Sequence, residues 1–557
     1  MDLVVFEQDK PFVLQALGQG EFDYIEAASE VVETEFFRFI KARGILRKLA
    51  QSYPSPRKKH DVPLFLYISA NLSMRLHGVH AFHAFPMVVR TGGMLHAFGP
   101  TAGKKVTDAE TGELHVLCEG TNQKNAYPRQ SPCDPDYLRK LSKDTDAAAL
   151  MGWFNTEALK VLHSRRAVDK AGLLIGDASY LFVPDNPNYE GSVRMRFDEH
   201  NHPLSKKEYE QLSPQQKERT QWRRCYKMVT LLHTNRQLEF FLFVGVRIIS
   251  GKAHESPVLY EMVRHCVRTT GKGVFKRLIL DRGFIDGESI GAVKQDLGID
   301  VLIPIRRNMD VYDDAMGLFK ERSVKWEPYT GAASRSSTPS QSRPESLRKR
   351  ERARQETNEK IKEQKPPPPP DKALVKTEVA AINGFRSWSS CPVPLTVVAN
   401  RETFADGHQK TWLLIDTAEH DNPCASRSDY ALRTSIEERY RQLKCFAELT
   451  HFTSRAFSMV VNQVIFILLA YDLLQFYLFR HARKDLTNKP MPHIRQQLLP
   501  SDNHVIVYYR NYYGLFTPME LLGFAVNLPE EPRMKIGQKC RRLCRELNGL
   551  ALQPRPP

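Results

Sequence analysis

Residues 225–250 read CYKMVTLLHTNRQLEFFLFVGVRIIS, in which two apolar runs flank the short stretch NRQL. Apolar runs of this length, rich in β-branched and aromatic side chains, predict two buried strands. The run AGLLIG (171–176) predicts a strand before them, and FKRLILD (275–281) and DVLIPIR (300–306) predict two more after them. We predict that these five strands form the core of the fold.

Two helices are predicted between the last three of these strands. Ser256 and Pro257 are typical of a helix start. The apolar residues that follow recur at the spacing of one helix face, namely Leu259, Met262, Val263, Cys266 and Val267. A second helix is predicted over residues 288–297. The resulting order, βββαβαβ, predicts an α/β fold.

The composition is that of a folded protein with an excess of basic residues. The chain has 557 residues, of which 41% are hydrophobic, and a formal net charge of +16. This charge favours a polyanionic partner, either nucleic acid or an acidic lipid surface. The nine scattered cysteines never occur as CxxC, which argues against a zinc site or a disulfide framework.

One segment has the length of a membrane span. Residues 457–479 are mostly apolar but contain Asp472, and a charge in mid-bilayer costs roughly 2.5 to 3.5 kcal/mol. We therefore predict a buried core helix and no membrane partner. The first fifteen residues lack the basic start and apolar core of a secretory signal, so we expect a cytoplasmic protein.

Two aspartates follow apolar runs of the predicted sheet. Asp177 comes after AGLLIG, and Asp281 closes FKRLILD. We expect each to end its strand at the carboxyl edge of the sheet, where the sites of open α/β sheets are found. Aspartates at strand ends also cap turns and helices, so this pattern alone leaves both interpretations open.

A third carboxylate occurs in the segment SDYALRTSIEERYRQLKCF (428–446). In a single helix at about 100° per residue, Tyr430, Arg433, Glu437 and Lys444 lie along one stripe beside an apolar seam. Glu437 is then held at the edge of the core. The alternative is a surface helix with an ion pair between Arg433 and Glu437, worth about 0.2 to 0.5 kcal/mol.

Carboxylates from two strands and one helix suit phosphodiester chemistry with divalent metals. Such a set can hold two Mg²⁺ ions about 3.5 to 4 Å apart. The metals would relieve the repulsion among Asp177, Asp281 and Glu437, while Arg433 and Lys444 could hold flanking phosphates.

The spacing Tyr430-x2-Arg433-x3-Glu437-x6-Lys444 resembles the Y(2)R(3)E(6)K signature of cut-and-paste bacterial insertion-sequence transposases of the DDE class. LLIGDASY around Asp177 and LILDRGF around Asp281 are similar to the first and second aspartate motifs of that family. The likeness covers roughly residues 170–307 and 395–482. These ranges contain most of the predicted sheet and the Glu437 helix.

The resemblance implies a ribonuclease-H-like catalytic core with a β-rich insertion. It implies that Asp177, Asp281 and Glu437 are the catalytic residues and hold two Mg²⁺ ions, with Mn²⁺ as a substitute. Tyr430, Arg433 and Lys444 would bind DNA phosphates, with Tyr430 and Lys444 holding the terminal phosphates of a hairpin intermediate.

The same resemblance implies the substrate and the partners. The substrate would be double-stranded DNA, first the terminal inverted repeats of the element and then the target, acted on by a homodimer associated with the bacterial nucleoid. Two alternatives remain open, namely a ribonuclease-H-like nuclease without strand transfer and an inactive DNA-binding relic of a transposase.

The predicted units follow the chain in order. A mainly helical N-terminal domain that binds DNA ends is followed by the two parts of the catalytic core, which an insertion separates, and by a C-terminal tail for DNA contact or dimerisation. The composition of residues 331–372 predicts a disordered stretch within the insertion. The expected limits of the units are 1–150, 165–307, 308–428, 429–482 and 483–557.

Overall fold

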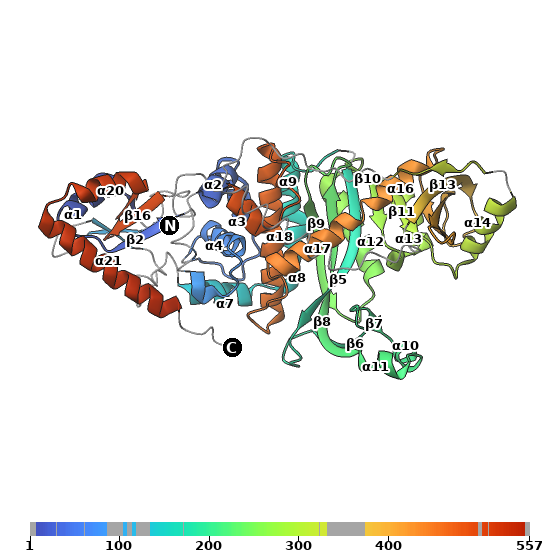
Figure 1. Cartoon of the computed structure of the whole chain (residues 1–557), viewed down its shortest axis with the longest axis horizontal. Helices are drawn as coiled ribbons and strands as arrows, with labels where there is room; N and C mark the ends of the chain where they lie inside the picture. The colour runs from blue at the N-terminus through green and yellow to red at the C-terminus, as the bar shows by residue number, and fades with distance from the viewer. Residues whose placement is uncertain are drawn as a thin grey trace.

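The computed structural model gives an elongated molecule, with the central sheet flanked by helices and a small unit at one end (Figure 1). The predicted disordered stretch 331–372 lies outside the residues that the structure describes. The described residues are 7–28, 31–60, 62–85, 88, 104–107, 114–117, 134–170, 172–321, 324–330, 374–498, 504–510 and 512–551.

The predicted strands form the centre of one mixed sheet. Its spatial order is β9-β8-β5-β10-β11. The first three strands are antiparallel, and β10 and β11 run parallel to β5 and to each other. This arrangement is consistent with a ribonuclease-H-like fold. The bounds are β5 (Gly172–Val183), β8 (Gln221–Thr234), β9 (Leu242–Ser250), β10 (Phe275–Leu280) and β11 (Asp300–Pro304).

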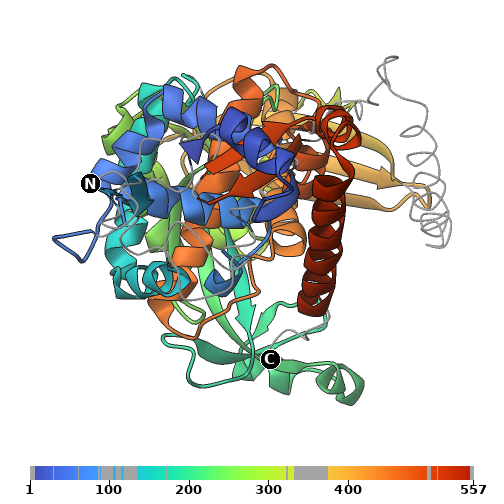
Figure 2. The ribbon, with the colours of Figure 1, turned by 90° about the vertical axis from the view of Figure 1, so that its left-hand side faces the viewer.

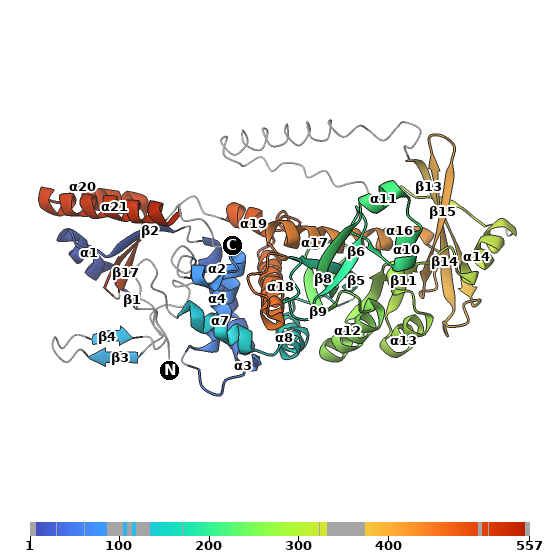
Figure 3. The same ribbon diagram turned by 90° about the horizontal axis from the view of Figure 1, so that it is seen from below.

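Helices cover both faces of this sheet. The predicted helices are present as α12 (Glu255–Thr270) and α13 (Gly287–Leu297), and all five apolar residues predicted to face the sheet from α12 are buried. Figure 3 shows these two helices on one side of the sheet and α17 (Thr434–Phe446) on the other. The chain order βββαβαβ is therefore confirmed, with additional elements between β5 and β8.

The long apolar segment forms α18 (Phe457–Arg480), a core helix that contacts β9 and the N-terminal helices. Among the described residues it is the one helix long and apolar enough to cross a membrane, and most of it is buried inside the protein. Asp472 is fully buried and accepts a 2.7 Å hydrogen bond from the Phe243 N–H. Burial raises the pKa of Asp472 well above its ordinary value, as expected for a carboxyl inside an apolar core.

The insertion lengthens the sheet beyond β11. Its strands β15, β14, β13 and β12 follow in that order, all antiparallel, and in Figure 3 the three longer ones stand at the end of the sheet beside α14. The bounds are α14 (Asp310–Glu321), β12 (Glu327–Pro328), β13 (Leu374–Phe385), β14 (Leu395–Phe404) and β15 (Gln409–Asp416).

A second insertion, between β5 and β8, forms an arm. The first five residues of β8 (Gln221–Cys225) extend past β9 and pair there with β6 (Val193–Phe197), which pairs with β7 (Pro203–Leu204). Two short helices complete the arm, α10 (Lys206–Glu210) and α11 (Pro214–Glu218). Figures 1 and 2 show these elements projecting from the body of the protein.

The N-terminal helices pack around α18. They are α2 (Val31–Ala42), α3 (Ile45–Ser52), α4 (Leu64–Leu76), α7 (Pro135–Asp144) and α8 (Ala147–Trp153), the last continued by a π-helical turn (Phe154–Ala158) and α9 (Leu159–Ser164). A short hairpin, β3 (Lys104–Thr107) and β4 (Leu114–Leu117), lies apart from them.

The two ends of the chain share a four-stranded sheet of order β1-β17-β16-β2. Its small core contains Val13, Leu17, Phe22, Val507 and Phe516. Segments that the sequence analysis assigned to the N-terminal domain and to the C-terminal tail therefore form one unit. The bounds are β1 (Glu7–Gln8), α1 (Lys10–Gly18), β2 (Tyr24–Ala28), β16 (His504–Tyr509), β17 (Tyr512–Phe516), α20 (Pro518–Val526) and α21 (Glu530–Ala551). Helix α19 (Met491–Leu498) precedes this unit in the chain and packs against α2 in the main core.

Candidate active site

The register of the sheet places the two aspartates side by side. The last pair of residues in the parallel pairing of β5 with β10 is Gly176 and Leu280, so Asp177 and Asp281 are the next residues on their strands. The expectation that Asp177 ends its strand is wrong, because β5 continues to Val183 as the partner of β8. The parallel pairing of β5 with β10 therefore ends at Gly176, whereas the antiparallel pairing of β5 with β8 continues past Asp177 to Val183.

Both aspartates use one carboxylate oxygen in the same local contact. Asp177 Oδ1 accepts from the Ala178 N–H and Asp281 Oδ1 from the Arg282 N–H, each at 2.8 Å. Gly176 leaves room for the side chains of Leu280 and of Leu259 on α12, since a Cβ there would lie 2.6 Å from Leu280 Cδ2 and 2.9 Å from Leu259 Cδ1. Among the hydrogen bonds of the described residues, the second oxygen of each carboxylate accepts none.

The signature residues lie on two helices rather than one, which corrects the sequence prediction. Tyr430 belongs to α16 (Pro423–Ala431), and Glu437 and Lys444 belong to α17. Between them the backbone N–H groups of Leu432 and Arg433 bond three residues back, to Asp429 and Tyr430. This tight turn, characteristic of 3₁₀ geometry, redirects the chain at Arg433.

Helix α17 is fastened along β5 by two side chains. The Tyr440 hydroxyl donates to the Asp177 carbonyl at 3.0 Å and lies 2.7 Å from the Thr230 hydroxyl. Lys444 Nζ donates to Ser179 Oγ at 2.7 Å and to the Tyr180 carbonyl at 2.9 Å.

These contacts fix the direction of Glu437. It precedes Tyr440 by three residues and Lys444 by seven, so all three side chains leave the same side of the helix. Glu437 is therefore directed to the edge of β5 that carries Asp177.

Arg433 is the positive charge among these carboxylates. Its Nη2 lies 2.6 Å from Glu437 Oε1, and the Arg433 side chain is 18% exposed against 51% for Glu437. Burial alone would lower the pKa of Arg433, but Tyr430, Asp281, Glu437 and Asp177 outweigh that effect and raise it. The ion pair proposed as the alternative reading is present, and it forms part of the carboxylate cluster.

Asp177 is strongly affected by this surrounding. Burial raises its pKa to about 7; the Ala178 N–H and Arg433 oppose this shift, while the negative charges of Asp281 and Glu437 add to it. Burial likewise raises the pKa of the Tyr430 hydroxyl. A cation at this position would return Asp177 to its ionised form at neutral pH.

The chemistry of the cluster suits a hard divalent cation, since carboxylate oxygens are the ligands that Mg²⁺ prefers. Within the part of the chain that the structure describes, however, no three His, Cys, Asp or Glu side chains are gathered closely enough to hold a metal ion. Arg433 neutralises Glu437 instead. Metal binding by Asp177, Asp281 and Glu437 would therefore require Glu437 to separate from Arg433.

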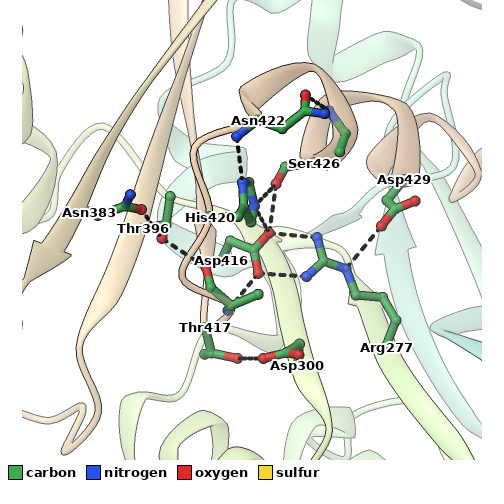
Figure 4. Close-up of polar contacts among 12 residues, drawn as sticks. Arg277, Asp300, Asn383, Thr396, Asp416, Thr417, His420, Asn422, Ser426 and Asp429 are labelled. Carbon is green, nitrogen blue, oxygen red and sulfur yellow. Dashed lines mark hydrogen bonds and ion pairs between the residues drawn. The ribbon is translucent and has the colours of Figure 1, made fainter.

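A buried ion network behind the site was not found from the sequence (Figure 4). Arg277 of β10 binds both carboxylate oxygens of Asp416, at 2.6 and 2.5 Å, and its Nε lies 3.3 Å from Asp429 of α16. The signal in the sequence was a charged residue inside the apolar run FKRLILD. Because Asp429 precedes Tyr430, the network joins the start of β10 to the helix that leads into the site.

Asp416 is fully engaged in this network. It also accepts hydrogen bonds from Ser426, from the Ala418 N–H and from His420. Burial would raise the pKa of Asp416, but the hydrogen bonds from His420 and Arg277 and the charge of Arg277 lower it to about 2. Asp416 is thus ionised at neutral pH and serves to position α16.

Comparison with known proteins gives one family. A family model described as a transposase DDE domain matches residues 192–473, which include Asp281 and the whole segment from Tyr430 to Lys444. Asp177 lies N-terminal to the matched range. The search of curated proteins found no match.

Proposed function

Because this chain belongs to the family of DDE transposases, we propose that it cleaves double-stranded DNA at the ends of its own element and joins them to a target. As a homodimer it binds the terminal inverted repeats, and it acts in the cytoplasm on DNA of the bacterial nucleoid. The observation that carries the proposal is the register that brings Asp177 beside Asp281, with Glu437 directed to the same edge from α17.

In this proposal Asp177, Asp281 and Glu437 are the catalytic residues and hold two Mg²⁺ ions, which Mn²⁺ can replace. Such ions would activate a water or 3′-hydroxyl and stabilise the negative charge that develops on the phosphate oxygens. The carboxylates bind metal ions only when they are ionised. Because the pKa of Asp177 is raised, Asp177 must lose its proton when it binds a metal ion.

In this proposal Tyr430, Arg433 and Lys444 bind the phosphates of the DNA. Arg433, once separated from Glu437, presents a planar guanidinium that suits a phosphate, and Tyr430 lies beside it. Lys444 is held on β5 by Ser179, and burial lowers its pKa to about 8. It therefore remains largely protonated at neutral pH and places a positive charge next to Asp177.

Two alternatives differ from this proposal in their products. A nuclease without strand transfer would release nicked DNA only. An inactive relic would bind DNA ends without cutting them. The adjacent positions of Asp177 and Asp281, with Glu437 directed toward them from α17, favour an active enzyme over the relic, since DNA binding alone needs none of these carboxylates.

The test is incubation of the full chain in Mg²⁺ with duplexes that span the DNA on either side of its coding sequence. Nicks, hairpins and joined molecules are resolved on denaturing gels. We expect all three products from the wild type and none from Asp281→Asn or Glu437→Gln, with end binding retained. Glu438→Gln is the matched control, because Glu438 pairs with Arg441 outside the cluster. Nicks alone would favour the nuclease, and binding alone the relic.

A further inference from the structure

The arm between β5 and β8 carries a surface that the candidate active site does not use. Its β6 strand pairs with the distal end of β8, with Arg194 opposite Arg224 and Arg196 opposite Trp222. Residues directly opposite in an antiparallel pair lie on the same face. One face of the arm therefore carries three arginines and a tryptophan, of which Arg224 is largely covered, with 13% of its side chain exposed.

This face is continuous with the face that carries Asp177. On β8, Thr230 is opposite Asp177, and Arg224 and Trp222 follow at even spacing, which keeps all three on one side of the strand. The other side of the arm is packed. There Phe197 contacts Tyr180 and Phe182, with ring centroids 5.1 Å apart in both pairs.

Stacking holds the exposed side chains in place. The Arg196 guanidinium lies 3.6 Å from the ring centre of Tyr209 and 4.8 Å from that of Trp222, and Arg194 lies 5.4 Å from Trp222. Trp222 is 50% exposed and the Arg194 side chain 52%. The arginines thus stay extended at the surface at a reduced cost in side-chain entropy.

The face has more positive charge than its neighbours neutralise. Asp185 pairs with both Arg194, at 2.9 Å, and Arg224, at 3.6 Å. Arg224 also donates to the carbonyl and hydroxyl of Ser192. One carboxylate therefore serves two of the three guanidinium groups, and Arg196 is held by aromatic rings alone among the contacts described.

Resting on the function proposed above, we propose that this face is a second DNA-binding surface that grips the phosphate backbone at a distance from the reacting phosphate. Trp222 is eight residues from Thr230, which at about 3.3 Å per residue gives at most ~26 Å. Duplex DNA rises about 3.4 Å per base pair. A duplex whose phosphate lies at Asp177 therefore meets the arm no more than about eight base pairs away.

Arginines fixed by aromatic rings suit a phosphate backbone better than they suit a protein partner. Contact with phosphates needs positive charge and reach but little apolar area, and Trp222 is the one large apolar side chain of the arm that is strongly exposed among the described residues.

The experiment measures how salt weakens binding to a 40-base-pair duplex from the flanking DNA. Each lost phosphate contact lowers the slope of log K against log salt by about 0.9. The variant Arg194→Gln/Arg196→Gln should therefore lose about 1.8 from the slope, so that its deficit relative to wild type is about tenfold larger at 50 mM than at 200 mM salt. Arg194→Lys/Arg196→Lys, which keeps the charge, should retain the slope.

Arg223→Gln is the matched control, because Arg223 lies on the opposite face of the same strand, 3.5 Å from the ring of Phe182. An unchanged slope in the double glutamine variant, or an equal loss in Arg223→Gln, overturns the proposal. So does a change in oligomeric mass without a change in slope, which would indicate a protein partner.

The length of the DNA gives a second readout. On duplexes that end at the cleaved phosphate on the side of the arm, wild type and the double glutamine variant should bind equally, because no DNA extends toward the arm. If the wild type cleaves flanking DNA but no length dependence appears, the arm proposal alone fails. If the wild type neither binds nor cleaves it, the proposed function fails as well.

Discussion

Replacement of Asp177 by Asn should stabilise the folded protein, and more so at alkaline pH. The pKa of Asp177 is raised from 3.8 to about 7 in the folded state, first by burial. A carboxyl with a raised folded-state pKa stabilises the protein fully below pH 3.8, and this contribution is lost as the pH rises through 7. Asn keeps the oxygen that accepts from the Ala178 N–H and remains neutral at every pH.

The difference between the two pKa values sets the size of the effect. At 1.36 kcal/mol per pH unit, the gain from Asp177→Asn is at most ~4 kcal/mol at pH 8 and ~2 kcal/mol at pH 5. Urea unfolding without divalent metal, followed at both pH values, measures it. Glu419→Gln, on an exposed residue, controls for the loss of one negative charge. A gain of equal size at pH 5 and pH 8 would refute the reasoning.

Magnesium provides a test of the same group without any measurement of activity. If ionised Asp177 is a ligand, Mg²⁺ at about a hundredfold excess over its Kd should stabilise the wild type at pH 8 by ~2.7 kcal/mol. The Asp177→Asn variant should gain much less from Mg²⁺, since it has lost one anionic ligand. An equal gain in both proteins would place the metal elsewhere.

Three further changes follow from the contacts described above. Arg277→Ala leaves the buried Asp416 without its bidentate partner, so urea unfolding should show a loss of ~3 to 5 kcal/mol; a loss under 1 kcal/mol would contradict this. Lys444→Ala removes the contact to Ser179 beside Asp177, and we expect first-strand nicking to survive better than hairpin and joined products on gels, whereas a uniform fall would favour a simple hydrolase. Deletion of residues 334–370, whose composition offers little apolar surface to bury, should leave Tm within about 2 °C by calorimetry, and a drop above about 5 °C would show that they pack.

The elements that were predicted correctly depend on local pattern. Apolar runs located the strands of the central sheet, and the spacing from Leu259 to Val267 located the buried face of α12. A single aspartate, Asp472, was enough to identify α18 as a core helix. Each of these inferences uses side chains within one or two turns or one strand, where periodicity reports directly which side is buried.

The site was predicted in part for the same reason. The positions of Asp177 and Asp281 directly after apolar runs predicted that they lie at one edge of the sheet. Helical spacing predicted that Glu437 and Lys444 lie on one side of a helix, and both belong to α17. The turn at Arg433 was missed, because α16 is held through Asp429 and α17 through Tyr440, on contacts with different strands. No local pattern records two anchors that lie far apart in the chain.

The sequence by itself determined which residues form the strands and helices of the central core and that Asp177 and Asp281 follow apolar runs of its sheet. Only the tertiary structure decided that β5 continues past Asp177, that Arg277 pairs with Asp416, and that the two ends of the chain share a sheet. These features depend on backbone pairing and buried charge between segments that are distant in the chain, such as Val183 with Arg224, Arg277 with Asp416, and Glu7 with Tyr512. The packing of the whole chain decides which segments make such contacts. The periodicity of the sequence indicates which side of an element is buried, but it does not indicate which segment packs against that side.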